Sequence, residues 1–105
     1  MSKSQITTNP DWLHNSHAGE LLVSEFMDPL RLTTEALAAD LQVEPTRIQL
    51  VIDGVKAVDA ELDLRLARYF RMTEGFFLRL QDSYELLEAK RALNGSLDRI
   101  VPRAA

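Results

Sequence analysis

The chain has 105 residues, which suffices for one compact domain and is too short for two. It has no cysteine, which excludes disulfides and thiolate metal sites, and no apolar run long enough to cross a bilayer, so we expect a cytoplasmic protein without a membrane partner. The formal net charge of −4 argues against a nucleic-acid ligand, because neutralisation of phosphates supplies much of the affinity of DNA-binding domains.

Residues 1–16 are polar and lack helical spacing, which predicts a flexible N-terminal arm whose Trp12 and Leu13 dock on the core. After the arm, apolar side chains recur at the 3.6-residue period of a helix, and no segment alternates as a strand would. The pattern predicts an all-α fold of five helices, at about residues 19–30, 34–41, 45–53, 60–70 and 74–93. Residues 94–105 are predicted to form a short tail.

Local signals mark where these helices begin and end. Thr33, Asp59 and Thr73 each precede an apolar repeat, and their side-chain oxygens can accept the free backbone N–H groups of a first helical turn. Pro29 should distort the last turn of the first helix, because a proline inside a helix removes a hydrogen bond. Gly54 suits the left-handed backbone conformation that closes the third helix.

The second and third helices are short and only a few residues apart, which favours a helix-turn-helix over residues 33–54. Ala38 is small, so the following helix can cross close to it. The third helix would then present its other face to the major groove of DNA, where Arg and Gln can form paired hydrogen bonds with base edges. Threonine hydroxyls and a lysine beside the helices would contact phosphates. The residues predicted to bind DNA are Thr33, Thr34, Thr46, Arg47, Gln49, Leu50 and Lys56.

The spacing alone leaves a structural alternative open, because two packed helices of a small bundle show the same pattern. A metal site is a second hypothesis, because His14, His17 and Glu20 are three residues apart and could share one helix face. However, His14 falls in the predicted arm, and His17 and Glu20 fall at the start of the first helix, where an acid also favours the helix dipole. We predict no metal and no cofactor. No nucleophile and base stand in a catalytic pattern, so we predict that the protein is not an enzyme.

The fifth predicted helix carries two lines of large apolar side chains. Phe76 and Leu80 lie one turn apart and are assigned to the core. Phe77, Tyr84 and Leu87 form a second line that a five-helix domain need not cover. We predict that this second line forms the interface of a homodimer.

Several separate blocks of the sequence, in the same order, resemble the HigA-type antitoxins. Residues 17–22 are similar to that family's H-P-G-E-I-L opening, and residues 64–70 to its L-R-L-A-R-Y-F. Residues 74–81 resemble its S-P-E-F-W-L-N-L-Q, and residues 83–86 its A-Y-D-L. The resemblance covers about residues 17–87, which is most of the chain.

The resemblance implies a Cro/C1 repressor-like helix-turn-helix domain over residues 17–93, with an extended C-terminal helix for dimerisation. It also implies a dimer that binds a palindromic operator of two half-sites, represses its own toxin–antitoxin operon, and neutralises a HigB/RelE-like ribonuclease toxin. The chain departs from the family's pattern at several positions. Gln42 stands at the usual turn glycine, and Asp63 stands at a usually small residue, where Leu62 is expected to take over part of the packing.

The charge of the DNA-binding half leaves two functions open. Residues 33–70 contain four basic and seven acidic residues, a net charge of −3. If a dimer neutralises about six phosphates, the log–log dependence of binding on salt has a slope of about −5. The alternative is a toxin-binding or adaptor protein whose helix-turn-helix is structural and does not bind DNA.

Overall fold

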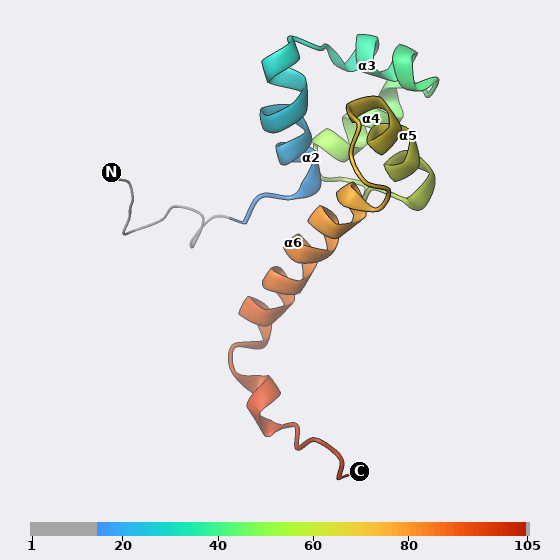
Figure 1. Cartoon of the computed structure of the whole chain (residues 1–105). Coiled ribbons are helices and arrows are strands. Elements are labelled where there is room, and N and C mark those ends of the chain that lie inside the picture. The colour runs from blue at the N-terminus through green and yellow to red at the C-terminus, as the bar shows by residue number, and fades with distance from the viewer. Residues whose placement is uncertain (1–14, 105) are drawn as a thin grey trace, which may run out of the picture.

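The computed structural model describes residues 15–104, and this part of the chain is built from helices without a strand (Figure 1). The first helix is composite and consists of α2 (Ala18–Leu21), the π-helix η1 (Leu22–Met27) and the 3₁₀ turn η2 (Asp28–Leu30). It is followed by α3 (Thr34–Leu41), α4 (Pro45–Ile52), α5 (Ala60–Phe70), α6 (Phe76–Leu93) and the 3₁₀ turn η3 (Ser96–Arg99). The predicted all-α fold of five helices is confirmed for the described residues. Trp12, Leu13 and His14 of the predicted arm lie outside them.

The first helix is capped by His17. The imidazole Nδ1 accepts hydrogen bonds from the backbone N–H groups of Gly19 (3.0 Å) and Glu20 (3.3 Å), and Glu20 Oε1 accepts one from the backbone N–H of His17 (3.1 Å). This reciprocal arrangement is a capping box, which fixes where the helix begins. At the other end, Pro29 lies in the 3₁₀ turn, so the last turn is distorted as the proline predicts.

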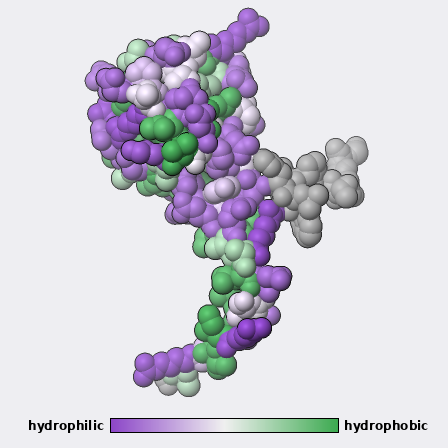
Figure 2. Space-filling model, turned by 180° about the vertical axis from the view of Figure 1, so that it is seen from behind, coloured by the Kyte–Doolittle hydropathy of each residue, from purple (hydrophilic) through white to green (hydrophobic). Residues whose placement is uncertain are grey.

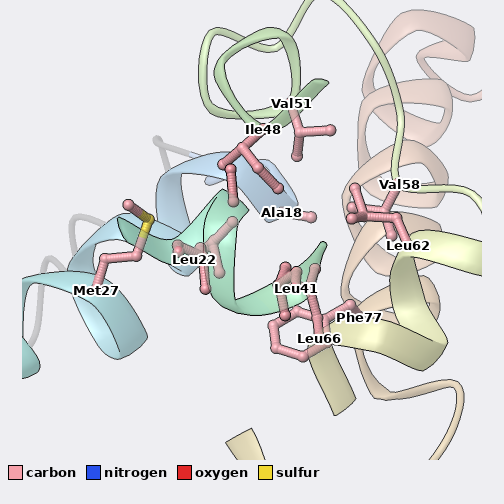
Figure 3. Close-up of a cluster of buried hydrophobic side chains, with 12 residues drawn as sticks. Ala18, Leu22, Met27, Leu41, Ile48, Val51, Val58, Leu62, Leu66 and Phe77 are labelled. Carbon is pink, nitrogen blue, oxygen red and sulfur yellow. The ribbon is translucent and has the colours of Figure 1, made fainter. Parts of the chain in front are cut away.

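The five helices enclose one apolar core (Figure 3). Each helix contributes at least one large apolar side chain that is less than 2% exposed. These side chains are Leu22, Leu37, Ile48, Leu62, Leu66 and Phe77. Gly19 allows the first helix to lie very close to α4, because a Cβ atom built there would lie 1.9 Å from the carbonyl oxygen of Val51. The start of the first helix therefore packs directly on the backbone of α4 and fixes the position of that helix in the domain.

A buried carboxylate joins α5 to α6. Asp63 is 1% exposed. Its Oδ2 accepts a hydrogen bond from the backbone N–H of Gly75 (2.6 Å), and its Oδ1 accepts bonds from those of Phe77 (2.8 Å) and Leu78 (3.1 Å). The side chain of one helix thus supplies the N-terminal cap of the next, where a negative charge is favoured.

The start of α6 therefore differs from the sequence prediction. The helix begins at Phe76 rather than at residue 74, and Gly75 precedes it with a φ of +90°. Thr73 does not provide a side-chain cap; only its carbonyl is used, which accepts the backbone N–H of Phe76 (3.0 Å). Leu62 is buried, in keeping with the expectation that it takes over part of the packing, but Asp63 beside it is also buried and caps α6, a role that was not predicted.

The predicted dimer line on α6 also needs correction. Phe77 has no exposed surface, and its ring packs against that of Phe26 with 5.1 Å between the centroids. Its assignment to an interface is wrong, because a side chain buried within one chain cannot contact a second copy. Tyr84 and Leu87 are half-buried. Beyond them, α6 and the tail extend away from the domain (Figure 1). Within residues 15–104, every helix is too short or too polar to be a candidate for a bilayer crossing.

Candidate DNA-binding surface

Helix α3, a turn at residues 42–44 and helix α4 form the helix-turn-helix unit. Thr33 Oγ1 accepts the backbone N–H of Ala36 (3.0 Å) and caps α3, as predicted. Gln42 ends this helix in the left-handed conformation, with a φ of +62°. The backbone N–H of Val43 then donates to the carbonyl of Ala38 (3.0 Å), and the side chain of Ala38 has no exposed surface. The small residue thus lies in the core.

The residues predicted to bind DNA fall into two groups, and none of them is buried. The first group lines an open hollow between α4 and the start of α5 and consists of Thr46, Arg47, Leu50 and Lys56. The second group lies at the start of α3. There, Thr34 Oγ1 donates a hydrogen bond to Oε1 of Gln49 (3.4 Å), next to the exposed Thr33.

Arg47 does not project freely from α4, contrary to the prediction. Its Nη2 donates to Oδ1 and Oδ2 of Asp59 (3.0 and 3.2 Å) and to Oε1 of Glu61 (3.4 Å). An Nη atom carries two hydrogens, so these acceptors occupy both of them and leave only Nη1 and Nε of Arg47 as free donors. Gln49 is also engaged, because its Nε2 donates to Oδ1 of Asp53 (2.9 Å). Both side chains must exchange these partners before they can form paired bonds with a base.

Asp59 serves two helices at once. Its Oδ1 accepts the backbone N–H of Leu62 (2.8 Å) and caps α5, as predicted. This hydrogen bond is the main reason why the pKa of Asp59 lies below its usual 3.8, and the nearby Arg47 guanidinium lowers it further. The carboxylate is therefore charged near neutral pH and attracts the arginine that was predicted to read DNA.

Glu61 is held in place by a second arginine. Its Oε2 accepts bonds from Nε (3.2 Å) and Nη2 (3.0 Å) of Arg65, whose Nη1 donates to the carbonyl of Leu41 (2.7 Å). Arg65 thereby ties α5 to the end of α3 and borders the hollow. Glu61 and Arg65 were not among the predicted site residues, because they lie on a different helix from α4 and their distance along the chain gives no periodic signal.

Two curated proteins are similar to this chain over most of its length. It is 35% identical over 86 residues to virulence-associated protein I of Dichelobacter nodosus, a match that covers 82% of this chain and 79% of that protein. It is 31% identical over 86 residues to an HTH-type transcriptional regulator of Haemophilus influenzae, with 80% of each chain covered. No family model matches the chain.

Solved structures share the fold. The antitoxin HigA of Pseudomonas aeruginosa, solved with the higBA promoter, matches with a TM-score of 0.76 and 26% identity over 88% of this chain and 100% of that chain. The chain belongs to the HigA family of helix-turn-helix proteins. A second protein of Pseudomonas aeruginosa, solved in complex with its operator DNA, matches this HigA-type chain with a TM-score of 0.80 and 29% identity, covering 88% and 98% of the two chains. The resemblance inferred from the sequence and the predicted helix-turn-helix fold class are confirmed.

Proposed function

We propose that this HigA-type chain is a DNA-binding antitoxin that binds the operator of its own toxin–antitoxin operon and represses it. The observation that carries the proposal is the hollow beside α4, where Thr46, Arg47 and Leu50 are gathered with the exposed Lys56. The helix that presents them is anchored by buried side chains on its other face, among them Ile48. A rigid helix with one polar, accessible face is what insertion into a major groove requires.

The residue types on this surface suit different parts of a duplex. Arg47 can donate a pair of hydrogen bonds to guanine, Gln49 can pair with adenine, and Leu50 can contact the methyl group of thymine. Lys56 and the hydroxyls of Thr33 and Thr34 suit phosphate oxygens, which fix orientation without reading sequence.

DNA must displace the acids that hold Arg47. The side chains of Arg47, Asp59 and Glu61 are 31%, 65% and 59% exposed, so the ion pairs are screened by water. Exposed ion pairs of this kind contribute roughly 0–1 kcal/mol, which is less than the roughly 1–3 kcal/mol of a paired arginine–guanine contact. The acids therefore weaken DNA binding without preventing it, and binding should be sensitive to salt.

A gel-shift assay with the DNA upstream of the chain's own gene tests this function. Arg47→Ala should weaken specific binding at least tenfold at low salt, in line with the loss of a base contact. Arg68→Ala is the matched control, because Arg68 is an exposed arginine near the other end of α5 and should retain wild-type affinity. Unchanged binding by the Arg47→Ala variant would contradict the assignment of α4 as the reading helix.

The proposed antitoxin acts as a homodimer on a palindromic operator and neutralises a HigB/RelE-like ribonuclease toxin. A dimer is favoured by the net charge of −3 over residues 33–70, because one copy alone would bind DNA weakly and two linked half-site contacts raise the overall affinity. For the toxin, the gene adjacent to this one should encode a short ribonuclease whose expression alone arrests growth. Co-expression of the chain should restore growth, and continued arrest would rule out neutralisation.

The engaged state of Arg47 favours a second candidate function, a toxin-binding or adaptor protein whose helix-turn-helix does not bind DNA. Under this candidate, Arg47→Ala leaves both growth rescue and DNA mobility unchanged, because the arginine serves only the chain's own acids. Under the leading proposal, the same variant retains growth rescue but loses the gel shift. The two assays on one variant therefore separate the candidates.

A further inference from the structure

One exposed leucine of the domain lies in a hollow at the end of α5. Eight large apolar side chains are exposed in residues 15–104. Five of them lie in the distal half of α6 and in the tail, and Figure 2 shows hydrophobic residues along this extension, which the resemblance assigns to dimerisation. The three on the domain itself are Leu30 (62% exposed), Val55 (68%) and Leu64 (48%). Leu64 lines a hollow, so a partner could enclose this side chain.

The hollow, called the α5 hollow below, combines apolar surface with positive charge. At 3.6 residues per turn, Leu64, Arg68 and Arg71 lie about one turn apart along one side of the helix end. Arg68 and Arg71 are exposed, and the neighbouring Met72 is half-buried. The residues that line the hollow are Leu64, Ala67, Arg68, Arg71, Met72 and Glu74.

The two arginines of the α5 hollow are free to bind another molecule. Neither Arg68 nor Arg71 has a hydrogen-bond or ion-pair partner among residues 15–104, although Glu74 lines the same hollow. By contrast, Arg47 and Arg65, which line the hollow beside α4, are both paired with acids of the chain. The end of a helix favours a positive charge, which accounts for Arg68 in the last turn but not for the exposed leucine beside it.

Arg71 adopts a backbone conformation that is unfavourable for an arginine. It ends α5 in the left-handed region, with a φ of +58°, where glycine would avoid the steric conflict of a Cβ atom. Strained residues of this kind are concentrated at functional sites, where the side chain has a role that offsets the strain. A guanidinium placed in the hollow gives Arg71 such a role.

The combination of charges and apolar surface favours a protein over a nucleic acid as the occupant. Phosphates could pair with the arginines, but they would leave Leu64 and Met72 uncovered, and Glu74 would repel them. A protein segment can place carboxylates beside the arginines and an apolar side chain over Leu64, and arginine and methionine are enriched in protein interfaces. The α5 hollow shares no lining residue with the hollow beside α4, so the two can bind different partners.

We propose that the α5 hollow binds the toxin of the proposed function, through a toxin segment that carries carboxylates beside an apolar side chain. Arg68 and Arg71 pair with the carboxylates, and Leu64 packs against the apolar side chain. The inference rests on the proposed antitoxin function and gives it a contact surface. Toxin and operator are then bound by different residues of the chain.

A charge reversal tests the arginines. In biolayer interferometry with the immobilised product of the adjacent toxin gene, Arg68→Glu/Arg71→Glu should bind at least about a hundredfold more weakly than the wild type, because like charges would face each other. Arg99→Glu/Arg103→Glu is the matched control, because it changes the net charge equally at two exposed arginines of the tail, and it should stay within about threefold of the wild type. Equal binding by the two variants would overturn the site alone, whereas a wild-type chain that does not bind the toxin would overturn neutralisation as well.

A leucine substitution tests the apolar part of the contact. Leu64→Ser should weaken toxin binding by about tenfold, because it removes apolar surface that the toxin covers. Leu30→Ser is the control, since Leu30 is an exposed leucine outside the hollow, and this variant should keep the wild-type dissociation constant. Equal effects of the two serine variants would overturn the docking of an apolar side chain at the hollow.

The gel shift distinguishes a toxin site from a second DNA-binding surface. Arg68→Glu/Arg71→Glu and the tail control should shift the upstream DNA equally, because they leave α4 unchanged and carry the same net charge. A hollow variant that binds the toxin normally but loses the gel shift would overturn the proposal in favour of a nucleic-acid site. Circular dichroism checks that the variants are folded. If the reversal unfolds the domain, Arg68→Gln/Arg71→Gln repeats the test and should weaken toxin binding by about tenfold, while unchanged binding would overturn the site.

Discussion

The buried carboxylate of Asp63 is expected to be among the most important polar groups for stability. Asp63→Ala removes the acceptor of three backbone N–H groups, at 2.6, 2.8 and 3.1 Å. Loss of an N-terminal cap costs roughly 0.5–2 kcal/mol, and a buried donor left without an acceptor costs roughly 1–3 kcal/mol. Phe77 N–H is buried, whereas water can reach Gly75 and Leu78, which are half-buried. We therefore expect a loss of about 3 kcal/mol, near the middle of the combined range.

Urea and thermal unfolding followed by circular dichroism will measure this loss. For a domain of this size, about 3 kcal/mol corresponds to a fall in Tm of roughly 12–20 °C. Asp63→Asn should fall between the wild type and Asp63→Ala, because its single carboxamide oxygen can still accept from Phe77 and Leu78. Asp82→Ala, an exposed aspartate of α6, is the control and should stay within about 0.5 kcal/mol of the wild type. A loss below about 1 kcal/mol for Asp63→Ala would refute the capping role.

Three further predictions follow from the helix-turn-helix and its surroundings. Gln42→Gly should raise the free energy of unfolding by about 1 kcal/mol, because the φ of +62° is costly for any residue with a Cβ atom; a lower Tm would contradict the strain at this turn. Glu61→Gln should strengthen DNA binding about threefold in a fluorescence anisotropy titration, because it removes one charged acceptor from Arg47. The control Glu74→Gln removes the same charge outside the α4 surface and should have a smaller effect. Equal effects of the two variants would show that only net charge matters. Because the folded pKa of Asp59 lies below 3.8, the stability from its charge is complete well above pH 3.8 and is lost as the pH falls through the folded pKa. Asp59→Asn keeps a capping side chain, so its stability difference from the wild type should shrink below pH 3.8, and a difference that stays constant into acid would contradict this linkage.

Local sequence signals predicted most of the fold, because the features concerned lie within a turn or two of one another. The helical period placed five helices, and Thr33 and Asp59 cap α3 and α5 as their positions before apolar repeats predict. The cap of α6 could not be predicted in this way. Its acceptor, Asp63, lies twelve residues before Gly75, on another helix, and only the packing of α5 against α6 brings them together.

The sequence predicted which face of α4 lies on the surface, but it did not predict the hydrogen bonds that the side chains on this face form. The surface of α4 follows from spacing, since the apolar side chains of the helix-turn-helix define which face remains outside. That Arg47 turns towards Asp59 and Glu61 depends on where the start of α5 lies relative to α4, which is a tertiary feature. The same limit explains Phe77, which a helical count places beside Tyr84 but which the aromatic cluster with Phe26 buries.

The central claim is that the face of α4 around Arg47 reads a specific DNA sequence. Fluorescence anisotropy of the full chain with the duplex upstream of its own gene, and with a scrambled duplex of equal composition, tests this claim most directly. At low salt we expect binding to the native duplex to be at least about a thousandfold tighter than to the scrambled one, with a log–log salt slope of about −5. Equal affinity for the two duplexes would contradict it.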